Sequence, residues 1–196
     1  VDDTDSDRNQ SYRVSLIASD QKTDNPEVTT VAGSGSSGST DATGTAAKFN
    51  VPRGLVTDGT NLYVADTDNH LIRKIVISSG VVTTLAGSAG SYGSTDATGT
   101  SARFKNPRGI TTDGTNLYVS DTNNHTIRKI VISTGAVTTL AGSGSSGSTD
   151  ATGTSARFSY PYGISSDGTH LYVSDTGSQK IRKIVIASRV VTTLAG

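Results

Sequence analysis

The sequence predicts an all-β protein built from repeated four-stranded antiparallel units, and three observations support this fold class. A Val-Thr-Thr-(Val/Leu)-Ala-Gly run ends at Gly33, Gly87, Gly142 and Gly196, so the run recurs at a nearly constant spacing, as in repeat proteins. Each interval holds β-branched runs separated by Asp-Gly and other turn signals. No window combines helical periodicity with helix-capping residues.

The unit at residues 88–142 shows the pattern of one repeat. It opens with a Gly/Ser/Thr-rich linker, in which Phe104 is expected to be buried between neighbouring units. Asp113-Gly114 marks a tight turn between strands. Four short strands are expected, at residues 110–112, 117–120, 126–133 and 137–141. Four short antiparallel strands per repeat are typical of one blade of a β-propeller.

The repeats predict one propeller domain or segment with three complete blades and an N-terminal half-blade. Residues 12–17 align with a third strand and residues 28–32 with a fourth, so the half-blade lacks first and second strands. The expected boundaries are a flexible lead-in at 1–11, the half-blade at 12–33, and blades at 34–87, 88–142 and 143–196.

Two further expectations concern packing and turns. Each blade is expected to have its own apolar layer, which in the second blade is built from Leu117, Val119, Ile127, Ile130 and Ile132. In the last blade, an arginine at position 189 replaces the glycine that the first two blades carry between their outer strands. Glycine accepts a positive φ far more easily than arginine does, so we expect a different turn type there.

Composition limits the classes of partner. Seventeen basic residues balance seventeen acidic ones among 196, so the chain has no general electrostatic attraction to nucleic acid or to anionic membranes. The absence of cysteine excludes disulfides and thiolate metal sites and fits an exported bacterial protein. We therefore expect an extracellular, periplasmic or cell-surface location, and Val1 is interpreted as a mature or trimmed N-terminus.

One string carries a family resemblance. Asn-Leu-Tyr-Val-(Ala/Ser)-Asp-Thr begins at Asn61 and Asn116 and is followed each time by Ile-Arg-Lys-Ile. Between these parts, residues 69–71 read Asn-His-Leu, residues 124–126 read Asn-His-Thr, and residues 178–180 depart with Ser-Gln-Lys. The string resembles the NHL repeat over about residues 28–196, and the resemblance implies a β-propeller, commonly six-bladed in that family.

Glycine patterns and histidines favour structural interpretations. Residues 33–38 and 142–147 match the dinucleotide-binding fingerprint by letter, but no helix is expected to follow either, so ordinary loops are favoured and no cofactor is expected. His70 and His125 are equivalent positions on adjacent blades, too far apart to share a zinc ion. We expect both to make hydrogen bonds in their turns.

The aspartates recur in every unit, which favours structure over catalysis. Asp66 and its equivalents end the second strand and are expected to hold the next turn or to pair with the arginine of the third strand. The linker aspartates are weighed against a Ca²⁺ site, because oxygen-rich loops hold hard cations. The three sets are Asp58, Asp113 and Asp167 in the Asp-Gly turns, Asp66, Asp121 and Asp175 after the second strands, and Asp41, Asp96 and Asp150 in the linkers.

The most informative candidate site residues are Arg53, Arg108 and Tyr162. Each follows the proline before a first strand, which a propeller places near the mouth of its central channel, and their chemistry differs between the copies. Adjacent Arg-Lys residues on the third strands point to opposite faces and lack an aromatic platform, which disfavours RNA binding. We interpret Arg53, Arg108 and Tyr162 as candidate partner contacts at the channel mouth.

The function predicted is a non-catalytic propeller scaffold for protein–protein interaction or self-assembly. Its expected partners are another protein or further copies of itself, as a homo-oligomer, a polymer or a segment of a longer propeller. No catalytic, metal or cofactor residue is assigned. The alternatives are a metal-dependent propeller lyase or hydrolase, and a carbohydrate-binding propeller for which Tyr92 and Tyr160 are the irregular loop aromatics.

Overall fold

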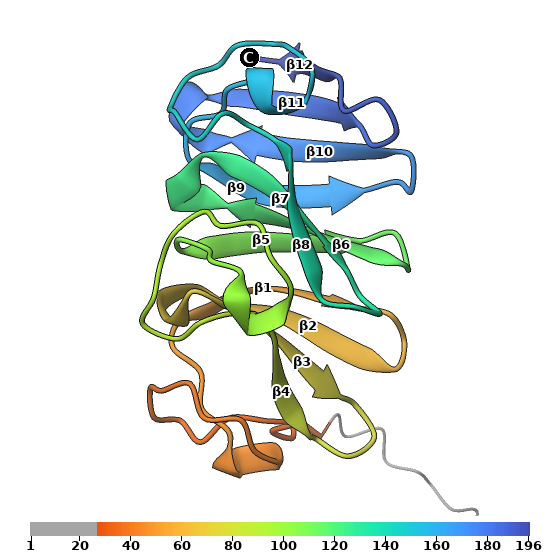
Figure 1. The fold of residues 1–196 in the computed structure, drawn as a ribbon. Coiled ribbons are helices and arrows are strands. Elements are labelled where there is room, and N and C mark those ends of the chain that lie inside the picture. Colours follow the sequence, from red (N-terminus) through yellow and green to blue (C-terminus); the bar gives the residue numbers. More distant parts are fainter. Residues whose placement is uncertain (1–26) are drawn as a thin grey trace, which may run out of the picture.

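The computed structural model describes residues 27–196, which form three four-stranded antiparallel sheets with strands in chain order (Figure 1). The first is β1 (Pro52–Thr57), β2 (Asn61–Asp66), β3 (Leu71–Val76) and β4 (Val82–Gly87). The second is β5 (Pro107–Thr112), β6 (Asn116–Asp121), β7 (Thr126–Val131) and β8 (Ala136–Ala141). The third is β9 (Pro161–Ser166), β10 (His170–Asp175), β11 (Lys180–Val185) and β12 (Val191–Ala195). The sheets are three propeller blades, which confirms the predicted fold class.

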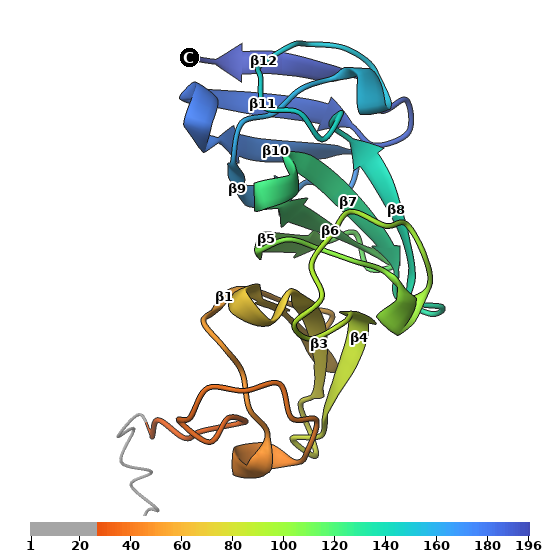
Figure 2. The same cartoon turned by 60° about the vertical axis from the view of Figure 1, so that its left-hand side comes forward.

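The blades follow one another along the molecule, from the first at the bottom of Figure 1 to the third at the top. Figure 2 shows that the first strands β1, β5 and β9 lie at the same side of their blades, with the fourth strands β4 and β8 at the opposite side. Strand β5 contacts both β1 and β9. The first strands therefore form the inner edge of the propeller, as in the predicted arrangement.

The turns inside a blade follow from their sequences. Asp113 accepts hydrogen bonds from the backbone N–H groups of Thr115 and Asn116 and from the Tyr118 hydroxyl, while Gly114 takes a φ of 89°. A 3₁₀ turn then joins the second and third strands and ends at a left-handed residue, which in the second blade is His125 with a φ of 55°. These turns are η2 (Thr67–Asn69), η4 (Thr122–Asn124) and η6 (Thr176–Ser178).

The long linkers cover the outer edge of their own blades. In the second blade, Thr98 forms a bridge with Ala136, and the N–H of Val137 donates to the carbonyl of Ala97 at 2.8 Å. A free edge strand offers unpaired backbone groups to other chains, so this cover removes the outer edge as a pairing site. Each linker also carries one short helix: η1 (Gly44–Ala46), η3 (Gly99–Ser101) or η5 (Gly153–Ser155).

A buried arginine fastens each linker to its blade. Arg128 is fully buried, and its guanidinium donates to Asp121 at 2.8 Å and to the linker residue Asp96 at 2.6 Å. The same guanidinium lies 5.1 Å from the centre of the Phe104 ring. The pairing expected for the second-strand aspartate is confirmed, and the linker aspartate completes the same ion-pair network. Equivalent networks join Arg73 to Asp66 and Asp41, and Arg182 to Asp175 and Asp150.

The apolar layers lie between blades, not within each blade as expected. Phe104 is fully buried in a cluster that combines Tyr63 and Ile72 of the first blade with Leu117 and Val119 of the second. Phe158 is buried in the same way between the second and third blades. Ile127 belongs to this second layer, because residues of opposite parity along a strand face opposite sides of the sheet.

The predicted half-blade falls mostly on residues 1–26, which lie outside the described residues. Over residues 28–32, where a fourth strand was expected, the structure has no strand. A strand needs a partner strand, and no described strand pairs with this segment. Val31 nevertheless places its carbonyl oxygen beside Gly80, as Leu85 does beside Gly135 in the next blade. Residue 31 therefore occupies the position of a fourth-strand residue without the strand pairing.

The turn at Arg189 does not differ from its counterparts, so that prediction was wrong. Arg189 has a φ of 59°, against 68° at Gly80 and 70° at Gly135. Hydrogen bonds fix it on both sides: its N–H donates to Val185, and its carbonyl accepts from Gly153 of the linker. The contacts of the repeat thus impose a left-handed conformation that an arginine side chain disfavours.

Replacing Arg189 by glycine is expected to stabilise the protein by roughly 0.5–1 kcal/mol. The substitution removes a left-handed penalty of about 1–2 kcal/mol and adds part of the backbone entropy cost of glycine. Urea unfolding followed by circular dichroism gives the change in free energy. Ser188→Gly is the matched control, because Ser188 has no positive φ and glycine should gain nothing there. An Arg189→Gly variant no more stable than the parent would contradict this account.

Candidate interaction surfaces

The three predicted site residues lie in a row along the inner edge of the propeller. Arg53, Arg108 and Tyr162 are the second residues of β1, β5 and β9. The guanidinium of Arg108 stacks over the Tyr162 ring, 4.1 Å from its centre. Burial lowers the pKa of Arg108, and the nearby positive charge of Arg53 lowers it further. The structure therefore brings the three residues together.

Glycines explain why these side chains become neighbours. A Cβ placed on Gly54 would overlap the carbonyl oxygen of Arg108, and one on Gly109 would overlap the carbonyl oxygen of Tyr162. The strands can approach this closely only because glycine lacks a Cβ. The Pro-x-Gly sequence thus places residue x of each blade directly beside residue x of the next.

A strained residue precedes each of these prolines. Val51, Asn106 and Tyr160 all have a φ between 49° and 52°, although a residue before proline favours extended conformations. The N–H of Asn106 donates to Nδ1 of His70, and the N–H of Tyr160 donates to Nδ1 of His125. Each histidine donates its backbone N–H within its own turn as expected, to Thr67 or Thr122, and its imidazole also accepts a hydrogen bond between blades.

The irregular loop aromatics pack against these histidines. Tyr92 lies edge-on to His70 with ring centres 5.6 Å apart, and Tyr160 lies edge-on to His125 at 4.6 Å. Both histidines accept a hydrogen bond through Nδ1, which requires that nitrogen to be unprotonated, and burial lowers the pKa of each imidazole. These contacts hold neighbouring blades together at the same rim that carries the arginines.

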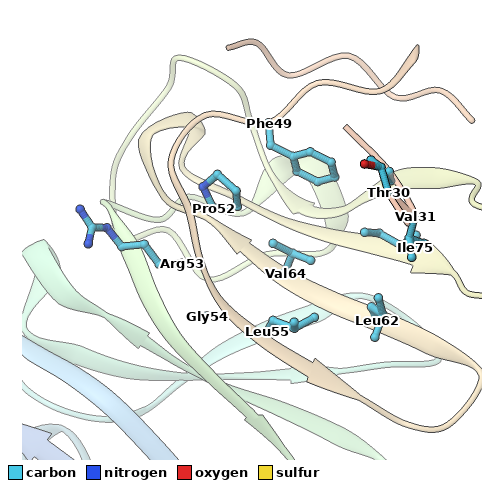
Figure 3. Close-up of a pocket in the computed structure, with 11 residues that line it drawn as sticks. Thr30, Val31, Phe49, Pro52, Arg53, Gly54, Leu55, Leu62, Val64 and Ile75 are labelled. Atoms are coloured by element: carbon cyan, nitrogen blue, oxygen red, sulfur yellow. The ribbon is translucent and has the colours of Figure 1, made fainter. Parts of the chain in front are cut away.

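The first blade presents an apolar face that no described blade covers. This first-blade face consists of Phe49, Leu55, Leu62, Val64 and Ile75, which line a pocket of about 380 Å³ together with residues 30–32. Figure 3 shows these side chains grouped over the sheet, with Arg53 directed away from them. Leu55 is 59% exposed, whereas Ile110, its equivalent in the second blade, is 6% exposed. The difference marks the place where a preceding blade would pack.

The last blade presents the complementary surface. This last-blade face consists of Ser174, Ile181, Leu194 and Ala195, three of which line a shallow hollow. Leu194 is 57% exposed, whereas its equivalent Leu140 is 4% exposed in the joint between the second and third blades. Ile181 is likewise exposed, whereas its equivalents in the first two blades are completely buried. In the first two blades, the equivalent surface is covered by the following blade.

The described residues hold no cluster of potential metal ligands. Across residues 27–196, no group of three His, Asp or Glu side chains converges as metal ligands. The linker aspartates considered for Ca²⁺ instead bind the buried arginines and the backbone of the fourth strands. In the same part of the chain, all helices are three-residue 3₁₀ turns, too short to span a bilayer. The glycine-rich patterns likewise lead into loops and not into α-helices.

Known sequences match this chain through the repeat. The family model of the NHL repeat matches residues 104–130. NHL repeat-containing protein 2 of Homo sapiens is 32% identical over 144 residues, which cover 68% of this chain and 20% of that protein. The chain thus spans about a fifth of the length of this curated relative.

Solved structures match through the fold, and the sequence matches assign the family. A Bacteroides thetaiotaomicron protein of unknown function superimposes with a TM-score of 0.63 at 28% identity, over 87% of this chain and 41% of that one. An auxiliary nutrient binding protein of the same organism gives a TM-score of 0.59 at 24% identity, over 72% and 36%. The repeated string, the match of the NHL model and the similarity to NHL repeat-containing protein 2 show that the chain belongs to the NHL-repeat family.

Proposed function

We propose that this protein is a non-catalytic propeller scaffold whose two exposed faces bind further NHL blades of a second copy. The observation that carries the proposal is that both faces reproduce the two sides of the internal joints. Leu55 stands where Ile110 is buried against the preceding blade, and Leu194 stands where Leu140 is buried against the following one. A surface that pairs twice inside the chain is complementary to its counterpart in another copy.

The contact is head-to-tail. The first-blade face of one copy would receive the last-blade face of another, so the interface joins two different surfaces and not one surface to itself. Two copies joined at both ends would supply six blades and bury all four exposed faces. Burial of exposed apolar surface is the driving force, because each Å² removed from water contributes about 25 cal/mol. Because the linkers cover the outer edges of the blades, the two exposed faces are the surfaces that remain for contact with another copy.

The experiment is sedimentation velocity on the 196-residue chain at micromolar concentration, with one variant for each face. The parent is expected to be a dimer. Leu55→Asp and Leu194→Asp place a charge on the first-blade and last-blade faces, and each variant alone is expected to be a monomer. The mixture of the two variants is expected to form a heterodimer, because each variant keeps one intact face that fits the other.

The same experiment includes a control variant and has outcomes that would contradict the proposal. Thr138→Asp places a charge at an exposed position of the middle blade and should leave the dimer intact. A parent that stays a stable monomer at tens of micromolar would refute the proposal. A variant that alone still dimerises like the parent would show a contact of one surface with itself, and a mixture that stays monomeric would contradict the head-to-tail contact. The predicted location outside the cytoplasm stays a prediction.

A further inference from the structure

We propose that Arg53 and Arg108 form a binding site for an oxyanion, a carboxylate or phosphate group, at the inner rim of the propeller, with Tyr162 as its flank. The site lies within one chain and does not depend on the head-to-tail contact. It assigns a ligand class to residues that the scaffold proposal leaves without a role.

No ion pair neutralises the positive charge at this rim within the described residues. In the described part of the chain, each buried arginine of the third strands has two aspartate partners, whereas Arg53 and Arg108 have no ion pair. The acidic side chain that acts on Arg108 is Asp68, which accepts a hydrogen bond from the Asn106 side chain. The charge of Arg53 acts on Arg108 across two neighbouring strands, so the two residues repel one another, and a bound anion would relieve this repulsion.

The arrangement is fixed in advance. Arg108 is half-buried, its Nε is buried without a hydrogen-bond partner, and its guanidinium is stacked on Tyr162. The backbone beneath is held by the close glycine contacts and by the histidine bonds to the residues before the prolines. A guanidinium held in place binds an anion with less loss of side-chain freedom than a mobile one does.

The chemistry of the two groups selects the ligand. A guanidinium is a planar fork of N–H donors that matches the two oxygens of a carboxylate or phosphate. Arg53 is exposed and Tyr162 is 36% exposed, so the site opens to solvent and accepts a small ligand. Tyr162 replaces the arginine of the first two blades, so the row presents two cationic groups and one aromatic ring.

The test is a titration of ¹⁵N-arginine-labelled protein with sodium phosphate and, separately, with sodium acetate, at constant ionic strength set by sodium chloride. The Nε–H resonances of Arg53 and Arg108 are expected to shift and to saturate, with a dissociation constant on the order of millimolar. The anion with the lower dissociation constant identifies phosphate or carboxylate as the preferred group.

Variants locate the site. Arg53→Gln, followed at Arg108, and Arg108→Gln, followed at Arg53, are each expected to weaken binding at least about tenfold, because both charges are needed. Arg157→Gln is the matched control and should leave binding unchanged. Tyr162→Phe keeps the stacked ring and should bind within about twofold of the parent, while Tyr162→Ala should bind more weakly. Equal, non-saturating shifts at all arginines, or unchanged binding in Arg53→Gln, would overturn the proposal.

Discussion

Replacing Arg128 by alanine is expected to destabilise the protein by about 3–5 kcal/mol, because it leaves the buried Asp121 carboxylate without its charge partner. Asp121 is fully buried, and its remaining hydrogen bonds come from Asn124 and from the backbone N–H of Lys105. The substitution also removes the bonds from Arg128 to the linker carbonyls of Arg103 and Thr95. The linker would thus lose its attachment at three points, counting Asp96.

Urea unfolding at neutral pH measures this loss, with two companion variants. Lys129→Ala is the matched control: Lys129 is the adjacent residue, half-buried on the other face and without an ion pair in the described structure, so its loss should stay near 1 kcal/mol or less. Arg128→Lys keeps the charge but not the fork of donors, so only part of the stability should return.

The double variant Asp121→Asn with Arg128→Ala completes a cycle. We expect it to lose less than the sum of the single variants, since the unpaired charge is then absent. Additive losses would show that Arg128 acts through packing against Phe104 and not through the ion pair.

The strands could be predicted because each blade repeats the same local signals. Residues 117–120 and 137–141 were expected as strands, and the structure has β6 over Asn116–Asp121 and β8 over Ala136–Ala141. The first strand begins earlier than expected, at Pro107 instead of residue 110. Proline cannot donate a ladder hydrogen bond, but this position pairs irregularly, with a register shift before Ile110. Local signals therefore located each strand but missed the irregular start of the first strand.

Contacts between distant parts of the sequence were harder to predict. The pairing of Asp121 with Arg128 could be predicted because a short turn joins their strands and places them side by side. The bond from Asp96 to the same arginine spans 32 residues of linker and blade, and no local pattern encodes it. The oxygen-rich loop composition instead made Ca²⁺ an alternative. Similarly, the turn bond of the His125 backbone was expected, but not the bond that its imidazole accepts from Tyr160 of the next blade, 35 residues away.

The candidate rim was predicted in part. The position after each proline indicated where Arg53, Arg108 and Tyr162 would lie, and the different residues in the three copies drew attention to them. The stacking of Arg108 on Tyr162 depends on how closely β5 and β9 approach, which the three-dimensional structure determines. Which charges lack a partner also depends on contacts far apart in sequence. The location of a repeat site is therefore easier to predict than its chemistry.

Phe104→Ala is expected to destabilise the protein by about 3–5 kcal/mol, and Phe49→Ala by clearly less when the protein is dilute. Phe104 is completely buried between two blades, and its truncation leaves a cavity that packed neighbours on both sides cannot fill. Phe49 has the same position in its repeat, and the equivalent arginine, Arg73, lies 5.1 Å from the centre of its ring. It remains partly exposed, because no described blade precedes it.

Unfolding midpoints at two protein concentrations show whether the loss depends on where a phenylalanine lies, because the two side chains are chemically identical. Below the association range, similar losses for the two variants would contradict the assignment of Phe104 to an inter-blade layer. Within the association range, the head-to-tail contact would bury Phe49 against the last blade of another copy. The loss caused by Phe49→Ala should then increase with concentration, since the variant weakens a contact that stabilises the folded state by mass action. The loss caused by Phe104→Ala should not change, because its layer is complete within one chain.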